Sequence, residues 1–293
     1  MAPMLVCVDR HLRVAVAGGS RLNERDDKAE TQKQWNTDPC GAETAAEHEP
    51  GTAAFFRRID TERYESYAPW MRARMGFEGF AGKKVLEIGP GLGTDHAQFA
   101  RAGAKMFALD LTRRHLELTA RRFEIEGLRT RLVRGDAERL PIAADSFDVV
   151  YAFGVLHHTP AMRQAVDEIR RVLRPGGTAI VGLYHRHSAF HWIYTVLWRG
   201  IRLGELRRKG YPRMLSDIEY RSAGSEAAPL VQVLSRRECR RLFGAFGDLR
   251  IRADHVEPWH FVPFAKPVHG ELRRQFERLA RHWGWYLTVF ARK

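Results

Sequence analysis

Between residues 83 and 184 the chain alternates between strand-like and helical segments, and this alternation constrains the fold more than any other feature of the sequence. Helical runs at 93–103, 111–127 and 161–177 separate the strand-like runs. Strands that alternate with helices of about 10 to 15 residues predict right-handed βαβ units. The sequence therefore predicts a Rossmann-like α/β domain, with a mostly parallel sheet and helices on both faces. The strand-like runs lie at 83–89, 105–110, 130–136, 148–153 and 178–184.

Three glycines occupy alternate positions directly after the first of these strands. Gly89, Gly91 and Gly93 follow Glu87 in the run EIGPGLG. Glycine at the carboxyl end of a strand lets the backbone approach a ligand closely, and doubly wound folds bind ligands at this edge. The dinucleotide-binding pattern would need its third glycine at Thr94, so a nicotinamide cofactor is disfavoured but stays open. A purely structural turn is the other alternative.

Acidic residues follow the second and third predicted strands. Asp110 ends the second strand, where a carboxylate can accept hydrogen bonds from both hydroxyls of an adenosine ribose. Asp136 ends the third strand, where it can receive the adenine amino group while the backbone of Ala137 meets the edge of the ring. Each acid has an alternative role as a helix N-cap. With the glycines, the two acids indicate a site for a nucleoside.

Five segments occur in an order that resembles one enzyme family: EIGPGLG, ALD, GDAERLP, SFDVVYAFGVLHHTP and LRPGG. They resemble the class I S-adenosylmethionine-dependent methyltransferases, in the branch similar to the ubiquinone and menaquinone biosynthesis methyltransferases, also called methyltransferase type 11. The resemblance is continuous over 82–184, and the later segments DLRIRAD and GWYLTVFARK resemble the family's last two strands. It implies a seven-stranded, mostly parallel sheet whose last strand is antiparallel.

The resemblance implies S-adenosylmethionine as the cofactor and places it along the edge of the sheet. Its methionine end would lie over Gly89 to Gly93, its ribose at Asp110 and its adenine beside Asp136. Phe153 and Gly154 would line the reacting centre. The full set of residues expected to bind the methyl donor is Glu87, Gly89, Pro90, Gly91, Gly93, Asp110, Leu111, Asp136, Ala137, Glu138, Phe153 and Gly154.

Three histidines are candidates for catalysis at the acceptor. Methyl transfer is an in-line displacement at a sulfonium carbon, so the protein mainly has to orient the acceptor and exclude water. An acceptor hydroxyl or acidic carbon also needs a base, and an imidazole with a pKa near ~6.5 is neutral at working pH. His157 and His158 follow the fourth predicted strand, and His185 follows the fifth. Each has a structural alternative, so the use of a general base stays open.

The chain divides into three parts by composition and pattern. Residues 1–28 lack sustained periodicity, so we expect a disordered tail that can be removed without loss of stability or turnover. Residues 29–80 predict helices, which the resemblance implies form a cap, and residues 81–293 are, by the same resemblance, the methyltransferase domain, with an insertion at about 185–234. The cap contains aromatic residues that are candidates for contact with the substrate or, alternatively, for ordinary packing: Tyr64, Tyr67 and Trp70.

The insertion begins with a predicted amphipathic helix. Ser188 can cap this helix, and a strongly basic stretch follows it. We expect a lid over the acceptor, in which Trp198 contributes to an aromatic wall and Arg202 meets an anionic group. A helix that only covers the sheet, or one that touches membrane lipid, are the alternatives. The apolar stripe consists of Phe190, Ile193, Tyr194, Leu197, Trp198 and Ile201.

The net charge of +13 comes from arginines spread along the chain and interleaved with acids. This pattern predicts a basic surface with a bias toward anionic partners rather than a dedicated nucleic-acid groove. Cys7, Cys40 and Cys239 have neither disulfide-framework nor metal-site spacing, so no metal is expected. Cys239 lies in a helix that Ser235 and Glu238 would open with a capping box, a context that indicates packing rather than nucleophilic catalysis.

The most consistent interpretation is a cytoplasmic enzyme of small-molecule metabolism that methylates an oxygen or carbon of a lipophilic or anionic acceptor. No apolar run reaches the roughly 18 residues that a membrane span needs, and charges interrupt any signal-peptide core at the start. A binding protein that keeps the methyl-donor site without catalysis, a nucleic-acid methyltransferase and a nicotinamide-dependent enzyme stay as alternatives. The acceptor and the oligomeric state cannot be derived from the sequence.

Overall fold

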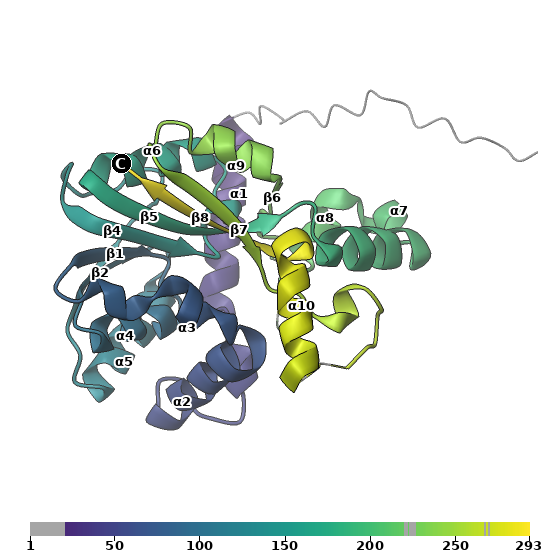
Figure 1. The fold of residues 1–293 in the computed structure, drawn as a ribbon, viewed down its shortest axis with the longest axis horizontal. Coiled ribbons are helices and arrows are strands. Elements are labelled where there is room, and N and C mark those ends of the chain that lie inside the picture. The colour runs from purple at the N-terminus through teal and green to yellow at the C-terminus, as the bar shows by residue number, and fades with distance from the viewer. Residues whose placement is uncertain (1–20, 220–221, 223–226, 267, 269) are drawn as a thin grey trace, which may run out of the picture.

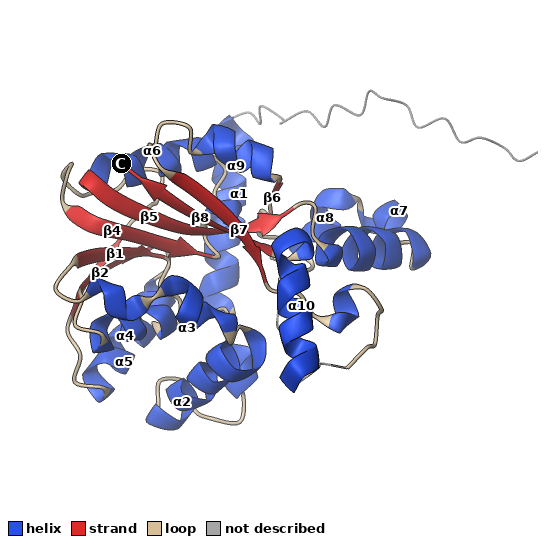
Figure 2. Cartoon of the chain, in the orientation of Figure 1, coloured by secondary structure: helices blue, strands red, loops and turns tan. Residues whose placement is uncertain are grey.

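The computed structural model describes residues 21–293, except 220–221, 223–226, 267 and 269, and its centre is a mixed β-sheet (Figures 1 and 2). Seven strands follow the order β3-β2-β1-β4-β5-β8-β7, in which β8 runs antiparallel to both β5 and β7. The other pairs on this path are parallel, which confirms the expected α/β fold. The seven strands are β1 (Lys84–Ile88), β2 (Lys105–Asp110), β3 (Thr130–Arg134), β4 (Phe147–Phe153), β5 (Leu173–His185), β7 (Leu249–Asp254) and β8 (Tyr286–Arg292).

An eighth strand, which the sequence analysis did not predict, lies beside the end of β5. Strand β6 (Val233–Leu234) pairs in parallel with Tyr184 and His185, where the insertion returns to the sheet. Two residues are too few to show the alternation that identifies a strand in a sequence. The pairing brings the end of the insertion to the carboxyl end of β5.

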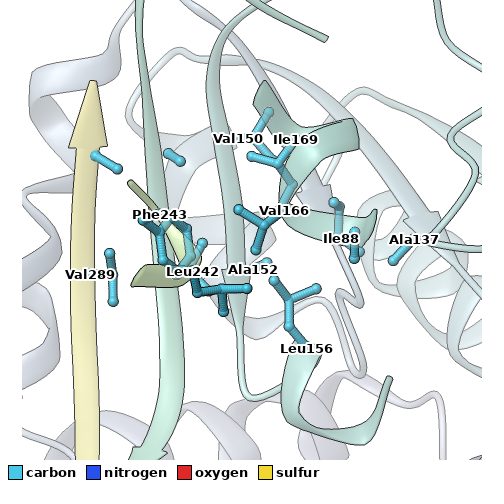
Figure 3. Close-up of a cluster of buried hydrophobic side chains, with 14 of the residues drawn as sticks. Ile88, Ala137, Val150, Ala152, Leu156, Val166, Ile169, Leu242, Phe243 and Val289 are labelled. Carbon is cyan, nitrogen blue, oxygen red and sulfur yellow. The ribbon is translucent and has the colours of Figure 1, made fainter. Parts of the chain in front are cut away.

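Helices cover both faces of the sheet because side chains alternate along each strand. On one face, α6 (Met162–Val172) and α9 (Arg236–Leu242) pack against the centre of the sheet. Figure 3 shows Val166 and Ile169 of α6 close to Val150 and Ala152 of β4. The other face is covered by α3 (Trp70–Met75), η3 (Phe77–Phe80) and α4 (Thr94–Arg101), whose core includes Tyr151 and Phe99. The core thus fixes β1 and β4, whose ends carry the expected site.

Helix α1 (Arg21–Thr37) corrects the boundary of the expected tail. Residues 1–20 lie outside the described part of the chain, but Arg21 to Lys28 are helical. Lys28 contacts two acids beyond β3, and Gln32 donates a hydrogen bond to the carbonyl of Leu111 after β2. Polar and charged contacts hold much of α1, so its sequence shows little apolar periodicity. The periodicity of apolar residues therefore did not predict this helix. The helices η1 (Ala42–Ala45), α2 (Ala53–Thr61) and η2 (Glu62–Tyr67) continue the region expected to form a cap.

The insertion after β5 forms three helices and then β6. Its first helix, η5 (Phe190–Arg202), is a π-helix, and Ser188 accepts a hydrogen bond from the backbone of His191 at its start, as expected. A π-helix has i→i+5 hydrogen bonds, so a stripe drawn with a period of 3.6 residues does not stay on one face. Helices α7 (Glu205–Lys209) and α8 (Tyr211–Ser216) follow, and the group projects beyond the end of the sheet (Figure 1).

The capping box predicted for α9 is present. The hydroxyl of Ser235 accepts from the backbone of Glu238, whose carboxylate in turn accepts from the backbone of Ser235. Cys239 is fully buried, and burial raises the pKa of its thiol to about 12, so it packs in the core as expected. Within the described residues, no helix combines the length and apolar character that crossing a bilayer requires.

Candidate functional site

A cavity of about 510 Å³ lies at the carboxyl ends of the parallel strands. Its wall continues from the turns after β1, β2, β3 and β4 to the end of β5 and the insertion. Helix α1, η2 and the short helix η6 (Pro258–His260) cover it from the outside of the sheet. One continuous space therefore has a half at the glycine-rich turn and a half lined by aromatic side chains.

The glycine-rich turn needs glycine for two separate reasons. Gly89 and Gly91 have positive φ angles of 70° and 57°, which side chains rarely adopt. A Cβ atom on Gly89 would also lie 2.4 Å from a methyl group of Val155, so the turn after β1 and the turn after β4 are in close contact. Gly93 begins α4, and a Cβ there would meet Thr119 at 3.2 Å. Gly93 thus allows close helix packing, whereas Gly89 and Gly91 line the cavity.

Most residues expected to bind the methyl donor line this cavity, and two do not. Gly93 lies behind the turn, and Glu138 accepts hydrogen bonds from the backbone of Ala161 and from Lys28 instead. The sequence pattern could not separate these two because they occupy the same motifs as true lining residues. The expected residues in the lining are Glu87, Gly89, Pro90, Gly91, Asp110, Leu111, Asp136, Ala137, Phe153 and Gly154.

Asp110 is held in place by the start of the next helix. One carboxylate oxygen accepts from the backbone and the hydroxyl of Thr112, both at 2.8 Å, and the other lies 3.2 Å from a ring nitrogen of His115. Burial disfavours the charged form, but His115 and the Thr112 hydrogen bonds outweigh it and lower the pKa of Asp110. Thr112, not Asp110, caps α5 (Arg113–Ile125). Asp110 therefore presents a fixed carboxylate to the cavity.

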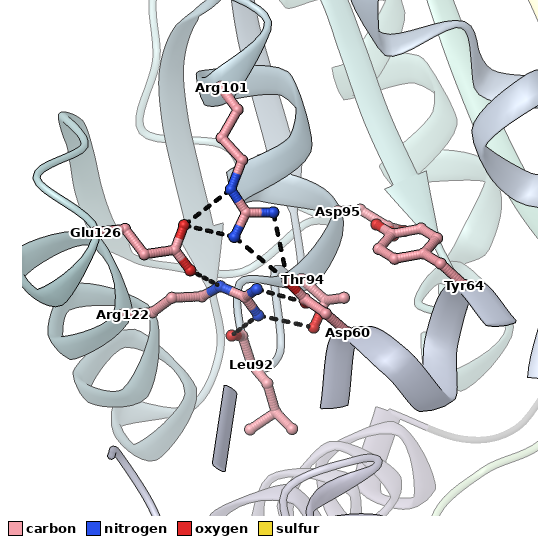
Figure 4. A network of polar contacts seen from close by, with 8 residues as sticks. All are labelled: Asp60, Tyr64, Leu92, Thr94, Asp95, Arg101, Arg122 and Glu126. Carbon is pink, nitrogen blue, oxygen red and sulfur yellow. Dashed lines mark hydrogen bonds and ion pairs between the residues drawn. The ribbon is translucent and has the colours of Figure 1, made fainter. Parts of the chain in front are cut away.

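A polar network fixes the glycine-rich turn between three helices (Figure 4). Arg122 of α5 is fully buried, and it contacts Asp60 at the end of α2 and Glu126 after α5. The same guanidinium donates to the carbonyl of Leu92 and the hydroxyl of Thr94, at 3.5 and 3.3 Å. Sequence analysis missed this network, because its members come from segments far apart in the chain.

A second buried ion pair lies at the centre of the cavity wall. Arg63 of η2 donates to Asp95 at 2.9 Å, and the hydroxyls of Tyr64 and Tyr151 donate to the same carboxylate at 2.7 Å. Burial opposes the charge on Asp95, but Arg63 and the two hydroxyls outweigh it and lower its pKa. Arg63 lines the cavity, and its Nε atom is buried without a hydrogen-bond partner in the described structure. The mixed aromatic and arginine run at 55–70 was the only sequence signal for this cluster.

The pKa of Glu87 is shifted in the opposite direction to that of Asp95. Its carboxyl group is buried and lies 2.9 Å from the Nδ1 atom of His96, whose Nε2 atom contacts Thr130 at 2.8 Å. Burial, with Asp95 nearby, raises the pKa of Glu87 well above its ordinary value, and burial lowers the pKa of His96 to about 3. Although the distance is that of an ion pair, both shifts favour a neutral glutamic acid that donates to a neutral imidazole.

Aromatic side chains form the other half of the cavity. The hydroxyls of Tyr67 and Tyr286 lie 2.7 Å apart, and Tyr184 stacks on Trp285 with ring centroids 4.2 Å apart. The hydroxyl of Tyr184 donates to Glu219 at 2.9 Å. Further lining residues from η5, from η6 and from the segment before η6 are Phe190, His255, Trp259 and His260. This half is mainly aromatic, and its polar groups are tyrosine hydroxyls, imidazoles and the carboxylate of Glu219, a combination that suits a small-molecule site.

Only one of the three cap aromatics expected at the substrate lines the cavity. Tyr67 does so, whereas Tyr64 is buried against Asp95 and lies under the guanidinium of Arg72. Trp70 packs against Phe153 and is absent from the lining. Tyr64 and Trp70 thus fit the alternative of ordinary packing.

The three candidate histidines lie in different surroundings, and only one of them lines the cavity. His158 lines the cavity, and its Nδ1 atom lies 2.7 Å from the carbonyl of Leu230, which fixes Nδ1 as the protonated nitrogen. Its other ring nitrogen, Nε2, lies 3.8 Å from a carboxylate oxygen of Glu219. His157 is fully buried against Tyr184, and burial lowers its pKa well below the ordinary value. His185 points to the carbonyl of Gly284, and burial lowers its pKa to about 4.

The same region contains a group of metal-binding side chains. His157, His158 and Glu219 offer ligand atoms within 4.8 Å of one another, and no other such group occurs in the described part of the chain. Imidazole nitrogen and carboxylate oxygen are common ligands of divalent cations. The histidine and cysteine spacings did not predict this group, because Glu219 comes from the insertion.

The structure places Trp198 and Arg202 outside the lining of the cavity. Neither lines the cavity, Arg202 is exposed, and Trp198 packs on Phe264. The expected lid assumed an α-helical stripe, but η5 is a π-helix, and of its residues only Phe190 lines the cavity. Phe190 contributes the wall that Trp198 was expected to form.

The fold and the cavity define a class I S-adenosylmethionine-dependent methyltransferase domain. In agreement, a family model described as a methyltransferase domain matches residues 86–181. S-adenosylmethionine is the cofactor of this class. A chain in the complex between the Haloferax volcanii Trm112 methyltransferase activator and a methyltransferase has the same fold, with a TM-score of 0.52 and 16% identity over 79% of this chain and 92% of that chain.

Two curated relatives are methyltransferases whose names refer to demethylmenaquinone and to a sterol. Demethylmenaquinone methyltransferase from Clavibacter sepedonicus is 37% identical over 101 residues, 34% of this chain and 41% of that protein. Sterol 24-C-methyltransferase from Gibberella zeae is 34% identical over 219 residues, 71% of this chain and 50% of that protein. The chain thus spans half or less of the length of these relatives, and the likeness covers the methyltransferase domain.

Proposed function

We propose that this chain transfers the methyl group of S-adenosylmethionine to an oxygen or acidic carbon of a small lipophilic acceptor. The observation that carries the proposal is the single cavity, which joins the turns expected to bind the methyl donor to a compartment of aromatic side chains. The names of the two relatives, a demethylmenaquinone and a sterol methyltransferase, support a lipophilic acceptor. A donor-binding protein without catalysis is the alternative.

The residues of the first half fit the methyl donor. The bare backbone at Gly89 and Gly91 would receive its methionine end, and the fixed carboxylate of Asp110 would accept from its ribose hydroxyls. Asp136 and Ala137 would meet the adenine. The unpartnered Nε atom of Arg63 supplies a buried cationic group beside the turn, which suits the carboxylate of the methionine end. The sulfonium of the donor supplies an activated methyl group.

The residues of the second half orient the acceptor and exclude water. Phe190 and Trp285 provide apolar walls beside Tyr184, whose ring is stacked between Trp285 and His157, and one hydrogen bond joins the hydroxyls of Tyr67 and Tyr286. An acceptor ring held between such walls would be fixed relative to the reacting centre at Phe153 and Gly154. Correct positioning of this kind can supply roughly 7 to 11 kcal/mol of the barrier reduction.

His158 is the residue placed to take the proton of the acceptor. It lines the cavity, and its Nδ1 atom is bound to the carbonyl of Leu230, so Nε2 is the nitrogen that would take up a proton. Glu219, 3.8 Å away, would stabilise the imidazolium that forms, and Tyr184 holds the Glu219 carboxylate in place.

The test combines binding with turnover on a panel of acceptors. Calorimetry of the purified chain should show binding of S-adenosylhomocysteine, and methyl transfer should occur to lipophilic phenols or quinols but not to hydrophilic analogues. His158→Asn should lower kcat by about 10²-fold or more with unchanged methyl-donor affinity. His185→Asn is the matched control, since His185 lies outside the cavity lining.

Three outcomes would contradict parts of the proposal. Donor binding without transfer to any acceptor in the panel would favour the non-catalytic alternative. Equal activity of the His158 and His185 variants would show that His158 is not the general base. Loss of wild-type turnover in EDTA, restored by a divalent cation, would show that the His157, His158 and Glu219 group holds a metal instead.

A further inference from the structure

Exposed apolar side chains gather on one part of the surface. Twelve large apolar side chains are exposed in the described residues, and ten of them lie in η5 and the turn and helix after it, in the loop after η6, and in α10 (Gly270–Trp283). Phe264 is 86% exposed, and Ile201 and Val262 are both 63% exposed. A monomer seldom leaves so many large apolar side chains exposed in one region, and such patches usually bind something.

Two of these segments are in direct contact. The rings of Trp198 in η5 and Phe264 after η6 lie 5.8 Å apart and nearly perpendicular. Deeper in the same interface, Tyr194 lies 5.1 Å from Trp259. The exposed residues therefore belong to one surface, at the end of the molecule where α7 and α8 project beyond the sheet (Figure 1). We call it the insertion surface: Leu197, Ile201, Leu203, Leu206, Val262 and Phe264.

Unpaired cations lie among these apolar side chains. Arg202, Arg207 and Arg208 are exposed, and none has a carboxylate partner within the described part of the chain. The carboxylate nearest in sequence, Glu205, is already paired with Arg199 at 2.8 Å. Lys266 is exposed two residues after Phe264. Apolar side chains with free arginines between them are typical of a surface that lies in the interface of an anionic membrane.

We propose that the insertion surface docks the protein on anionic lipid bilayers. The apolar residues would enter the boundary between headgroups and acyl chains, and the arginines would meet lipid phosphates. The protein would lie on the bilayer rather than span it, in keeping with the absence of a spanning helix in the described residues. Charge complementarity selects this occupant over a second copy of the chain, since two copies of this surface would bring the same cations together.

The insertion surface and the acceptor half of the cavity share their elements. Phe190 lines the cavity at the start of η5, and Leu197 and Ile201 are exposed later in the same helix. Trp259 lines the cavity from η6, and Val262 and Phe264 follow it. A docked protein would thus receive a lipophilic acceptor near the bilayer. This route rests on the proposed function, whereas the docking itself does not.

The docking test uses the full chain, sedimented with vesicles and without any acceptor. Vesicles of phosphatidylglycerol and phosphatidylcholine should bind the protein, and pure phosphatidylcholine vesicles should bind it at least about tenfold more weakly. A Val262→Ser, Phe264→Ser variant and an Arg202→Gln, Arg207→Gln, Arg208→Gln variant should each lose about tenfold or more in binding. High salt should weaken binding of wild type more than binding of the arginine variant.

Matched controls use apolar residues that are exposed elsewhere. Ile125→Ser and Val133→Ser change side chains that are 36% and 40% exposed and lie at α5 and β3. These variants should bind vesicles as wild type does, and all variants should keep wild-type affinity for S-adenosylhomocysteine, which shows that they fold. Wild type that ignores anionic vesicles, or controls that lose binding as strongly as the insertion-surface variants, would overturn the proposal. So would a dimer that Phe264→Ser dissociates, because the surface would then join two copies.

The readouts keep the two proposals separate. Vesicle binding is measured without methyl transfer, so docking stands if no lipophilic acceptor is methylated. Methylation of a soluble lipophilic acceptor in detergent, with no vesicle binding, would leave the proposed function intact and refute docking.

Discussion

The two halves of the cavity differ in how the chain builds them. The half at the glycine-rich turn, which we propose binds the methyl donor, comes mainly from short turns that directly follow β1, β2, β3 and β4, within residues 87–155. The aromatic half, which we propose binds the acceptor, comes from η2, the end of β5, the insertion, η6 and the start of β8, which span more than two hundred residues of sequence. A site made of local turns is visible in a sequence, whereas a site made of distant segments exists only in the folded chain.

The largest effect is expected at Arg63, which borders both halves. Arg63→Met would leave the buried carboxylate of Asp95 without its cation, and loss of one partner of a buried pair costs about 3–5 kcal/mol in the free energy of unfolding. Urea unfolding measures this loss. Adding Asp95→Asn to the variant should recover part of it, and a single variant as stable as wild type would show that the pair is not coupled.

A smaller effect is expected for Asp110, within the methyl-donor half. Asp110→Ala removes the acceptor proposed for the ribose hydroxyls and should weaken S-adenosylhomocysteine binding by about 1–3 kcal/mol. Calorimetry on the folded variant measures this change. Asp148→Ala is the control, since Asp148 binds Lys84 and Arg174 at the opposite end of the sheet. Equal affinities of the two variants for S-adenosylhomocysteine would show that Asp110 does not bind the methyl donor.

The acceptor half predicts a contrast between two tryptophans. Trp259→Ala should raise the acceptor KM about tenfold, equivalent to about 1.4 kcal/mol, because Trp259 lines the cavity. Trp198→Ala should leave KM nearly unchanged, because Trp198 packs on Phe264 outside it. Steady-state kinetics at saturating methyl donor measures both values. If Trp198→Ala raised the acceptor KM more than Trp259→Ala, the lid that the sequence predicted would be supported instead.

The smallest effect is expected for Glu87→Gln, and its sign depends on pH. The pKa of Glu87 is raised in the folded state, so protonation favours folding below the unfolded pKa, and this advantage is lost as pH rises through the folded pKa. Glutamine keeps a neutral donor to His96, so it should change stability by less than about 0.5 kcal/mol at pH 5 and stabilise at pH 8.

Asp95→Asn is the control of opposite sign for this experiment. The pKa of Asp95 is lowered in the folded state, so its stabilisation is present above the unfolded pKa and is lost as pH falls through the folded pKa. Asp95→Asn should therefore destabilise the protein at both pH 5 and pH 8. Thermal melting over this range measures both variants, and destabilisation by Glu87→Gln at pH 8 would show that Glu87 is ionised.

The sequence predicted the sheet, the glycine-rich turn and the acids beside it because each leaves a short-range pattern. Alternating strands and helices, and a turn that tolerates only glycine, depend on neighbouring residues. Arg63, Trp259 and Glu219 leave no such pattern. Their surroundings are made by other segments, so nothing within a few residues of them indicates a cavity.

Two errors share a physical cause. The stripe that placed Trp198 over the acceptor assumed 3.6 residues per turn, and a π-helix does not follow that period. The tail was assigned by its lack of apolar periodicity, but Lys28 and Gln32 hold α1 by polar contacts. Both predictions relied on the local pattern of apolar residues. In both segments the structure depends instead on contacts with distant parts of the chain or on a different helical period.

Helix α1 touches both halves of the cavity. Lys28 contacts Asp136 in the half proposed for the methyl donor, and Trp35 lies 5.4 Å from His158 in the half proposed for the acceptor. If a ligand in one half shifts or rigidifies α1, the affinity of the other half would change with it. Reciprocity then requires that the methyl donor change acceptor affinity by the same factor by which the acceptor changes donor affinity.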